Sequence, residues 1–433
     1  MNPAVIEKFK HSSKLTEIGE IPMEWGVVKL GDAVEINRSS RDPTRENPDE
    51  KILYIDIESV EGGTGIIKIA REILGKEAPS RARRIIHQND VIMSTVRPYL
   101  KAFALVPREY NNQICSTGFA VLSCKNEISP RYLLYTLFSK EVIEQCNKMM
   151  MGGQYPALNQ SQVAKIKIPL PPLPEQRRIA EVLGTVDSAI QKVGGAIEST
   201  ERLKKGLMQR LLTRGIGHER FRISKELGCE IPEEWVVTQL KEVVVSYKNG
   251  IYKPSEFYGT GYPSIRMYNI RQGRINIKKA PLLQVTEQEL EDYGLEEGDI
   301  LINRVNTAEL VGRAGVVPRG LGKITFESKN IRVRLIKTKV SPDFFSVYVQ
   351  TAVYAKQIRS KAKVAVAQAT ITQDDIDTVL FPLPPLPEQR RIAEILSAVD
   401  RKLELERRRK EKLERVKKGL MNELLTGRKM VKV

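Results

Sequence analysis

The chain of 433 residues is strongly basic: 70 lysines and arginines stand against 53 aspartates and glutamates, which gives a formal net charge of +17. The hydrophobic share of 41% is enough for ordinary buried cores, and no run of about eighteen apolar residues is present, which argues against a membrane-spanning helix. The charge favours a polyanionic partner, and a generic basic surface is the alternative reading.

The cysteines indicate a reducing compartment. Cys115, Cys124, Cys146 and Cys229 show neither CxxC spacing nor the pattern of a disulfide framework. The first fourteen residues also lack the apolar core of a signal peptide. We therefore expect a cytoplasmic protein.

Each half of the chain begins with the same signature after a polar lead-in. Ile-Pro-x-Glu-Trp ends at Trp25 in the first half and at Trp235 in the second, and a short apolar run follows each copy. These are the only two tryptophans of the chain. We expect them to anchor the core where each domain starts, and a role in ligand binding is the less favoured alternative.

The body of each half is predicted to be rich in short strands. Residues 53–60 match residues 264–270, and a turn with a buried strand recurs at 88–93 and 297–302. A polar loop rich in hydrogen-bond donors follows that strand, at 94–101 and 303–313. A Ser-Pro pair later opens an amphipathic helix in each half, and a second polar loop comes at 152–159 and at 363–370.

The most distinctive stretch of the chain occurs twice. PLPPLPEQRRIAEVL fills residues 169–183, and residues 382–396 repeat it with Ile395 in place of Val182. We predict a proline-rich rod that turns into a helix at the Glu-Gln pair, because proline suits only the first turn of a helix.

Both helices are predicted to be long. Apolar residues recur at steps of about three and four, and both copies end in Lys-Lys-Gly-Leu-Met followed by Leu-Leu-Thr. Some forty residues make a rod of roughly 60 Å. A rod that long cannot bury its apolar stripe alone, and its duplicate is the simplest partner. Two unrelated amphipathic helices are the alternative, which explains the repeated sequence poorly.

The sequence offers no constellation for catalysis. The histidines, His11, His87 and His218, are scattered, and no Cys/His cluster has metal-ligand spacing. No GxSxG elbow is present, and the glycines at 62–65 lack the GK[ST] ending of a phosphate loop and indicate a turn. An Asn-Pro-Pro-Tyr-type tetrapeptide is missing as well. These absences argue against a single-chain methyltransferase, nuclease or ATPase.

Taken together, the duplicated PLPPLPEQRRIAEVL/IL segments, their GLMxxLLT endings and the IPxEW starts resemble the specificity subunit of type I restriction–modification enzymes. The GDIL strand at 298–301 supports the likeness, and the first half departs from it mildly with Asn-Asp-Val-Ile at 89–92. The resemblance covers essentially the whole chain. It implies an α+β fold with two similar β-rich target-recognition domains and two long helices packed as an antiparallel coiled coil, with approximate two-fold symmetry. The predicted segments are 1–168 for the first recognition domain, 169–214 for the first proline rod and helix, 215–381 for the second domain, and 382–433 for the second rod, helix and tail.

The same resemblance implies a subunit without catalytic activity. Each domain would read one half of a bipartite DNA site, and the helices would set the spacing. Two modification subunits would methylate adenine with S-adenosylmethionine, and restriction subunits joined through them would use ATP and Mg²⁺. No cofactor or metal is expected in this chain. The alternative is a non-enzymatic coiled-coil scaffold that holds proteins.

Candidate DNA-binding residues come from the polar loops and from basic segments of each half, because base readout needs donors such as Arg, Asn and Gln while phosphate contacts need positive charge. In the first half they are Arg81, Arg83, Arg84, Ser94, Thr95, Arg97, Lys101, Gln154 and Tyr155. In the second half they are Lys253, Arg266, Tyr268, Asn269, Arg271, Asn303, Arg304, Asn306, Thr307, Arg313, Lys363 and Gln368.

Two further segments have competing interpretations. The basic run at 407–410 is read first as a solvated face of the second long helix, and steering of the DNA backbone is the alternative. The proline rods with the first helical turns are read as structural hinges, and a docking site for the modification subunits is the alternative.

Overall fold

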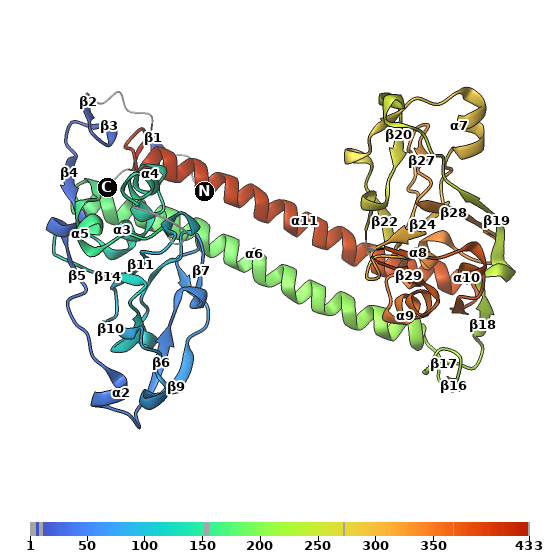
Figure 1. Ribbon diagram of the computed structural model, residues 1–433, viewed down its shortest axis with the longest axis horizontal. Coiled ribbons are helices and arrows are strands. Elements are labelled where there is room, and N and C mark those ends of the chain that lie inside the picture. The colour runs from blue at the N-terminus through green and yellow to red at the C-terminus, as the bar shows by residue number, and fades with distance from the viewer. Residues whose placement is uncertain (1–5, 8–11, 151–155, 272, 367, 432–433) are drawn as a thin grey trace. The chain divides into compact units, whose positions relative to one another are not determined.

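The chain folds into two units, each with its own hydrophobic cores. The computed structural model describes residues 6–7, 12–150, 156–271, 273–366 and 368–431 (Figure 1). Unit 1 contains Met1–Gly195 together with Arg407–Val433, and unit 2 contains Ala196–Glu406. Among the described residues, no helix combines the length and the apolar character needed to cross a bilayer.

Unit 1 is built on two four-stranded sheets. The first has the order β12-β11-β14-β5 and is antiparallel throughout, with strands β12 (Phe103–Leu105), β11 (Val91–Ser94), β14 (Phe119–Cys124) and β5 (Val34–Ile36). The second has the order β10-β13-β6-β9, with strands β10 (Ala82–Ile86), β13 (Gln113–Ser116), β6 (Lys51–Ile55) and β9 (Arg71–Leu74). Within it, β13 and β6 run parallel.

Unit 2 repeats this plan. Its six-stranded sheet has the order β19-β28-β24-β26-β22-β21, with strands β19 (Val244–Asn249), β28 (Asn330–Leu335), β24 (Ile300–Asn303), β26 (Ala314–Val316), β22 (Gly273–Ile275) and β21 (Ile270–Arg271). The neighbours β26, β24, β28 and β19 correspond to β12, β11, β14 and β5. The parallel pair recurs as β20 (Tyr258–Ile265) with β27 (Thr325–Phe326). The predicted α+β class and the likeness of the two bodies are therefore confirmed.

The proline-rich segments differ from the predicted rods in their first part. Strand β15 (Lys167–Leu170) pairs with β4 (Gly26–Lys29), and β31 (Leu380–Leu383) pairs with β18 (Val236–Gln239). Each pair forms a two-stranded sheet, in which a proline lacking its N–H is tolerated at an edge. The duplicated segment thus joins the end of each domain to its beginning before the helix starts.

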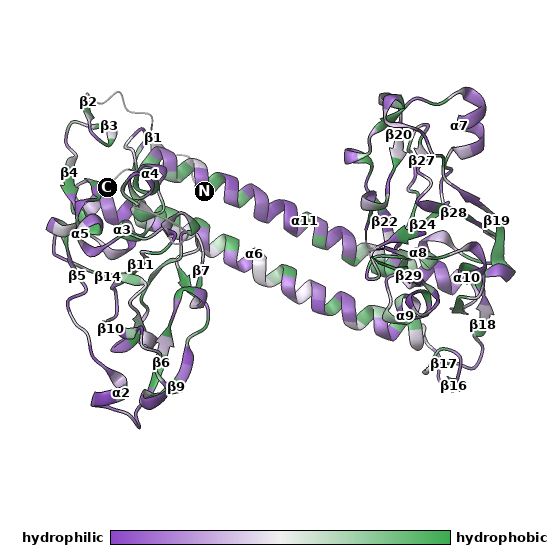
Figure 2. Ribbon diagram, viewed as in Figure 1, coloured by the Kyte–Doolittle hydropathy of each residue, from purple (hydrophilic) through white to green (hydrophobic). Residues whose placement is uncertain are grey.

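Two long helices follow these strands. Helix α6 spans Leu173–Thr213 and helix α11 spans Leu386–Leu424, so each begins in one unit and ends in the other. In unit 1 the start of α6 shares a hydrophobic core with the end of α11, and in unit 2 the start of α11 shares one with the end of α6. Inside each unit the packing is therefore antiparallel, as predicted. Figure 2 shows hydrophobic residues recurring along both helices among hydrophilic ones.

The same helix contact carries a repeated ion pair. In unit 2 the Lys204 ammonium lies 2.8 Å from Asp400, and in unit 1 the Lys417 ammonium lies 2.7 Å from Asp187. All four side chains are largely shielded from solvent. The relation of one unit to the other by a two-fold axis stays a prediction.

In each unit a hydrogen bond between a buried tryptophan and a glutamate, called here the Trp–Glu lock, joins the start of the domain to the start of its long helix. The Trp25 indole N–H donates to Glu175 at 3.1 Å, and the Trp235 indole N–H donates to Glu388 at 3.0 Å. Both tryptophans are fully buried, which confirms the predicted anchors. In each helix the residue after this glutamate is a glutamine. In unit 2 it is Gln389, whose side chain accepts from the Ser341 backbone N–H and donates to two backbone carbonyls.

Helix pairs complete each domain beside the long helices. They are α3 (Pro130–Leu137) with α4 (Lys140–Met149) in unit 1, and α8 (Pro342–Tyr348) with α9 (Ala352–Lys361) in unit 2. The predicted Ser-Pro starts are confirmed, with Pro130 and Pro342 in the first helical turn.

Candidate nucleic-acid interface

In unit 1 the polar loop after β11 lies against the residues that precede α5 (Gln160–Lys165). The backbone N–H of Leu158 donates to the Thr95 carbonyl at 2.9 Å, and the N–H of Arg97 donates to the Pro156 carbonyl at 3.1 Å. The two loops that the sequence singled out in this half are thus neighbours in space.

Unit 2 brings its two loops together in the same way, but by strands. Strand β25 (Val305–Asn306) pairs with β30 (Gln368–Thr370), which also pairs with β29 (Lys363–Ala365). The Ile371 N–H donates to the Arg304 carbonyl at 2.9 Å. Strand pairing therefore brings together segments of unit 2 that are far apart in the sequence.

Three asparagine side chains, hydrogen-bonded in series, connect the unit 2 loop 303–313 to the strands beside it. Asn306 donates to the Asn303 side-chain oxygen at 2.9 Å, Asn303 donates to Asn330 at 2.8 Å, and Asn330 donates to the Ile265 carbonyl at 3.1 Å. Asn303 and Asn330 are fully buried and face each other across β24 and β28. The Asn306 oxygen accepts from the Thr307 N–H. These amides fix the loop, and they are already hydrogen-bonded inside the domain.

The corresponding side chains of unit 1 are internal as well. The Ser94 hydroxyl donates to the Val96 carbonyl at 2.8 Å, and the Thr95 hydroxyl donates to the Gly118 carbonyl at 2.9 Å. Both side chains are buried. Among the predicted DNA contacts, the structure therefore places Ser94, Thr95 and Asn303 as supports of the loops.

The basic cluster at the start of β10 divides into paired and exposed members. Arg83 forms an ion pair with Asp42 at 3.2 Å, and Arg84 donates to the Asn37 side chain at 2.7 Å. Burial lowers the pKa of the Arg84 guanidinium. Arg81 is exposed.

The candidates before β22 divide similarly. Lys253 forms an ion pair with Glu289 at 2.7 Å, and Arg266 stacks over the Tyr258 ring. Asn269 is buried and donates to the Asn276 carbonyl.

The remaining candidates are accessible in different degrees. The exposed ones are Arg97, Tyr268, Arg271, Thr307, Arg313, Lys363 and Gln368, and the half-buried ones are Lys101, Arg304 and Asn306. Gln154 and Tyr155 lie outside the described residues. Contact of any of these side chains with DNA stays a prediction.

Lys101 is half-buried at the end of the unit 1 loop. Its ammonium donates to the Phe138 carbonyl at 2.9 Å. Burial lowers the pKa of Lys101, and the nearby Lys418 and Lys417 lower it further.

Sequence reasoning missed a group of exposed apolar and aromatic side chains near these loops. Tyr99 and Leu100 are about half exposed in unit 1, and Val364 is exposed on β29 in unit 2. Their letters carry no signal of exposure, because the same residue types fill the cores.

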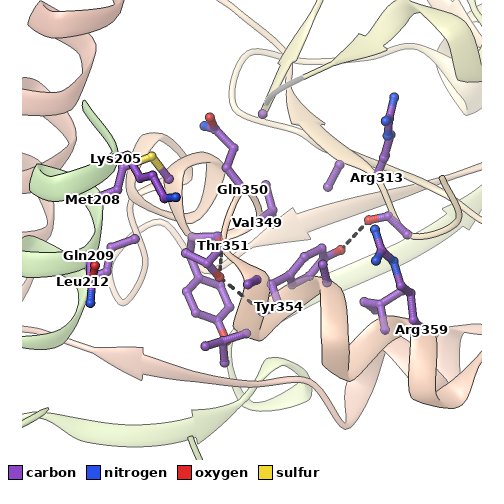
Figure 3. Close-up of a pocket in the computed structure, with 18 of the residues that line it drawn as sticks. Lys205, Met208, Gln209, Leu212, Arg313, Val349, Gln350, Thr351, Tyr354 and Arg359 are labelled. Atoms are coloured by element: carbon purple, nitrogen blue, oxygen red, sulfur yellow. Dashed lines mark hydrogen bonds between the residues drawn. The ribbon is translucent and has the colours of Figure 1, made fainter. Parts of the chain in front are cut away.

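A pocket of about 970 Å³ lies in unit 2 beside the loop 303–313 (Figure 3). Its walls come from the end of α6, from residues 309–314, and from the turn between α8 and α9. The predicted residues Arg271 and Arg313 line it. Tyr354 helps to shape one wall, since its hydroxyl donates to the Gly312 carbonyl at 2.9 Å.

Within the part of the chain that the structure describes, no three His, Cys, Asp or Glu side chains gather in a way that could hold a metal ion. The four cysteines are free thiols. In the basic run at 407–410 on α11, the first three residues are exposed and Lys410 is half-buried, and the reading of this run as a solvated helix face stays a prediction.

Comparison with known proteins gives consistent similarities. The family model "Type I restriction modification DNA specificity domain" matches residues 22–199 and 232–415. A Methanocaldococcus jannaschii chain assigned to the type I restriction enzyme MjaX as its specificity subunit is 33% identical over 97% of this chain and 97% of its own length. The type I restriction enzyme MjaVIII specificity subunit of the same organism is 29% identical over 98% of this chain and 97% of its own.

Two solved structures are similar in fold. A chain from a structure that describes the assembly and conformational transition of the type I R-M system is 28% identical, covers 94% of this chain and 99% of its own, and has a TM-score of 0.57. The S subunit of a type I restriction–modification system from M. genitalium, 14% identical with 95% and 98% covered, has a TM-score of 0.58 and supports the fold alone.

Proposed function

The chain belongs to the type I restriction–modification DNA specificity family, and from this premise we propose that each of its two domains reads one half of a two-part DNA site. The chain is the non-catalytic specificity subunit that directs the activities of other subunits to a sequence. Family membership favours this role over a protein-holding scaffold.

One observation carries the proposal of two half-sites. The loop pair of unit 1 and the loop pair of unit 2 occupy equivalent places on the same strand order, yet they present different side chains. Arg97 is exposed in the first, and Thr307 and Arg313 are exposed in the second. Base edges in the major groove are distinguished by the donors and acceptors that face them. Equal scaffolds with unequal surfaces are therefore suited to two different short sequences.

We further propose that two modification subunits dock on the duplicated segment, one copy at each. The Trp–Glu lock and the hydrogen bonds of the glutamine explain why Glu and Gln recur in the duplicated segment. The exposed residues of the same segment recur too, and these contacts do not explain them. They are Pro172, Pro174, Arg177 and Glu181 in unit 1, and Pro385, Pro387, Arg390 and Glu394 in unit 2. Two identical exposed faces fit two copies of one partner.

The remaining chemistry is placed in partner subunits. We propose that the modification subunits use S-adenosylmethionine, that restriction subunits joined through them use ATP and Mg²⁺, and that this chain holds no cofactor. The expected compartment is the cytoplasm, where the free thiols stay reduced.

The test of the two half-sites is methylation mapping. The chain is assembled with its modification subunits, and methylated adenines are mapped on random DNA for the wild type, Arg97→Ala and Arg304→Ala. We expect a two-part sequence for the wild type, relaxed in one half by Arg97→Ala and in the other half by Arg304→Ala. Methylation without sequence preference would refute DNA recognition. Relaxation of both halves by each variant would refute the division between the domains.

A further inference from the structure

The pocket of unit 2 lies beside a place where the two units carry different side chains. In unit 1, Lys417 at the end of α11 lies 5.8 Å from the ring centre of Tyr135 and 6.0 Å from that of Phe138. The equivalent positions of α8 and the following turn carry Val347 and Gln350. Of these two residues, Gln350 lines the pocket and accepts a hydrogen bond from Lys204 at 3.2 Å, next to the same Lys-Lys sequence of the long helix.

The open space is positively charged. Among the described residues that line it, five side chains are cationic and two, Glu201 and Glu309, are acidic. Lys204 is neutralised by Asp400, whereas Arg359 donates to a neutral partner, the Glu309 carbonyl, at 3.1 Å. The guanidinium groups of the lining suit phosphate oxygens, which they can hold through two parallel hydrogen bonds.

The geometry favours a ligand with several phosphates over a single anion. In Figure 3, Lys205 and Met208 lie on one side of the pocket, and Arg313 and Arg359 lie on the other. The turn at Thr351, which begins the ten-residue helix α9, faces the same space and adds the positive end of a helix dipole. A nucleic-acid strand carries one negative charge per roughly 3.4 Å along its axis, so it can reach both sides at once.

We propose that this pocket binds consecutive phosphates of the DNA strand that leaves the recognition surface of unit 2. The inference rests on the proposed function, because Arg271 and Arg313 join the pocket to the loop surface assigned to DNA. Lys205 on α6 and Arg359 on α9 are the new members. They anchor the backbone to the long helix without reading sequence.

The experiment uses the double variant Lys205→Gln/Arg359→Gln, which changes no side chain of the recognition loops and keeps part of each aliphatic stem, although it removes the Arg359 hydrogen bond to the Glu309 carbonyl. The whole chain is assembled with its modification subunits, and the DNA dissociation constant is measured against salt on a DNA with the mapped site and on one without it. The matched control is Lys279→Gln, an exposed cation of unit 2 that does not line the pocket.

We expect the slope of log affinity against log salt to become shallower by roughly 2, about one for each lost phosphate contact. Between about 50 and about 200 mM salt, the loss of affinity should be roughly tenfold smaller than for the wild type. The ratio of specific to non-specific affinity should stay unchanged. A slope equal to those of the wild type and Lys279→Gln overturns the inference.

Other occupants give different results. If the double variant keeps its DNA slope but no longer binds the modification subunits, the pocket receives an acidic protein segment and the inference fails. If ATP or pyrophosphate binds the wild-type complex without DNA, is lost in the variant, and the DNA slope is unchanged, a free phosphate ligand replaces the DNA strand. A wild-type complex without any sequence preference would instead refute the proposed function, independently of the slopes.

Discussion

Single buried amides distinguish the two recognition loops. Asn303 faces Asn330 across two central strands of unit 2, whereas Ser94 faces Phe119 at the matching place in unit 1. The amide pair links the loop to the strand beneath by side-chain hydrogen bonds, while the serine bonds only to its own loop. Side chains that look like DNA readers in the sequence thus serve as supports.

Asn303→Ala should therefore destabilise the protein by about 1–3 kcal/mol, because it leaves buried amide groups of its neighbours without partners. Ser94→Ala, the matched change in unit 1, should cost less than about 1 kcal/mol, since only one local bond is lost. Chemical denaturation of both variants measures the difference. Equal losses would show that the amide chain contributes nothing beyond a local turn.

Buried thiols give the stability a pH dependence. Burial raises the pKa of Cys115 and of Cys146 to about 12. In the unfolded chain a thiol has a pKa of about 8.5, so between about pH 9 and pH 12 the unfolded state has lost a proton that the folded state keeps. The stabilising contribution is complete below the unfolded pKa and is lost as the pH rises.

The free energy of unfolding should then fall by about 1.4 kcal/mol per pH unit for each fully buried thiol above about pH 9. Urea denaturation at pH 8 and pH 10 measures the slope. Cys115→Ala supplies the control, since its slope should be shallower by one thiol. An unchanged slope would mean that this thiol ionises equally in both states.

At the scale of elements, the duplicated segment has an inner and an outer face. Its inner face is the Trp–Glu lock and the buried glutamine, and its outer face includes Arg177 in one copy and Arg390 in the other. Adjacent residues of one helix turn should therefore separate stability from assembly.

Gln389→Ala should cost roughly 3 kcal/mol of stability, because one buried side chain bonds three backbone groups, and Arg390→Glu should cost almost none. Arg390→Glu should instead reduce the bound modification subunits from two to one, and the double change with Arg177→Glu to none. Native mass spectrometry counts them, and Lys192→Glu, an exposed change elsewhere on α6, is the control. Two bound subunits in the double variant would exclude the outer face as the dock.

The repeated letters of the sequence were sufficient to predict the long helices, the tryptophan anchors and the polar loop that follows a buried strand in each half. Segments that recur in both halves are expected to form the same elements, so a prediction made for one domain also applies to the other. It was less informative where the copies diverge. The positions of Tyr135 and Phe138 carry Val347 and Gln350 in the second half, and these letters do not indicate that Gln350 lines a pocket. Pro169 reads as part of a rod, yet β4 supplies it with a strand partner.

At the scale of the whole molecule, unit 1 is discontinuous in sequence. Its core combines residues near the start of α6 with Leu424, the last residue of α11, and Leu425 just after it, and strand β1 (Ile6–Glu7) pairs with β32 (Met430–Val431). Unit 2 is continuous from Ala196 to Glu406. A destabilising substitution at one end of a long helix should therefore lower the stability of one unit only.

Leu424→Ala should lower the stability of unit 1 by about 2–5 kcal/mol, since its side chain is fully buried there. Ile392→Ala, at an equally buried place in unit 2, should lower the other unit by a similar amount. Differential scanning calorimetry should show two transitions, each shifted by one variant. A single transition displaced equally by both would mean that the units unfold as one body.

The discontinuity also sets an order of events on the ribosome. Residues 407–431, which complete the core of unit 1, are synthesised after every residue of unit 2. The later-made domain can thus reach its final fold while the first-made one still lacks its closing helix. A nascent chain that ends at Glu406 would therefore contain all of unit 2, while unit 1 would still lack the residues that complete its core.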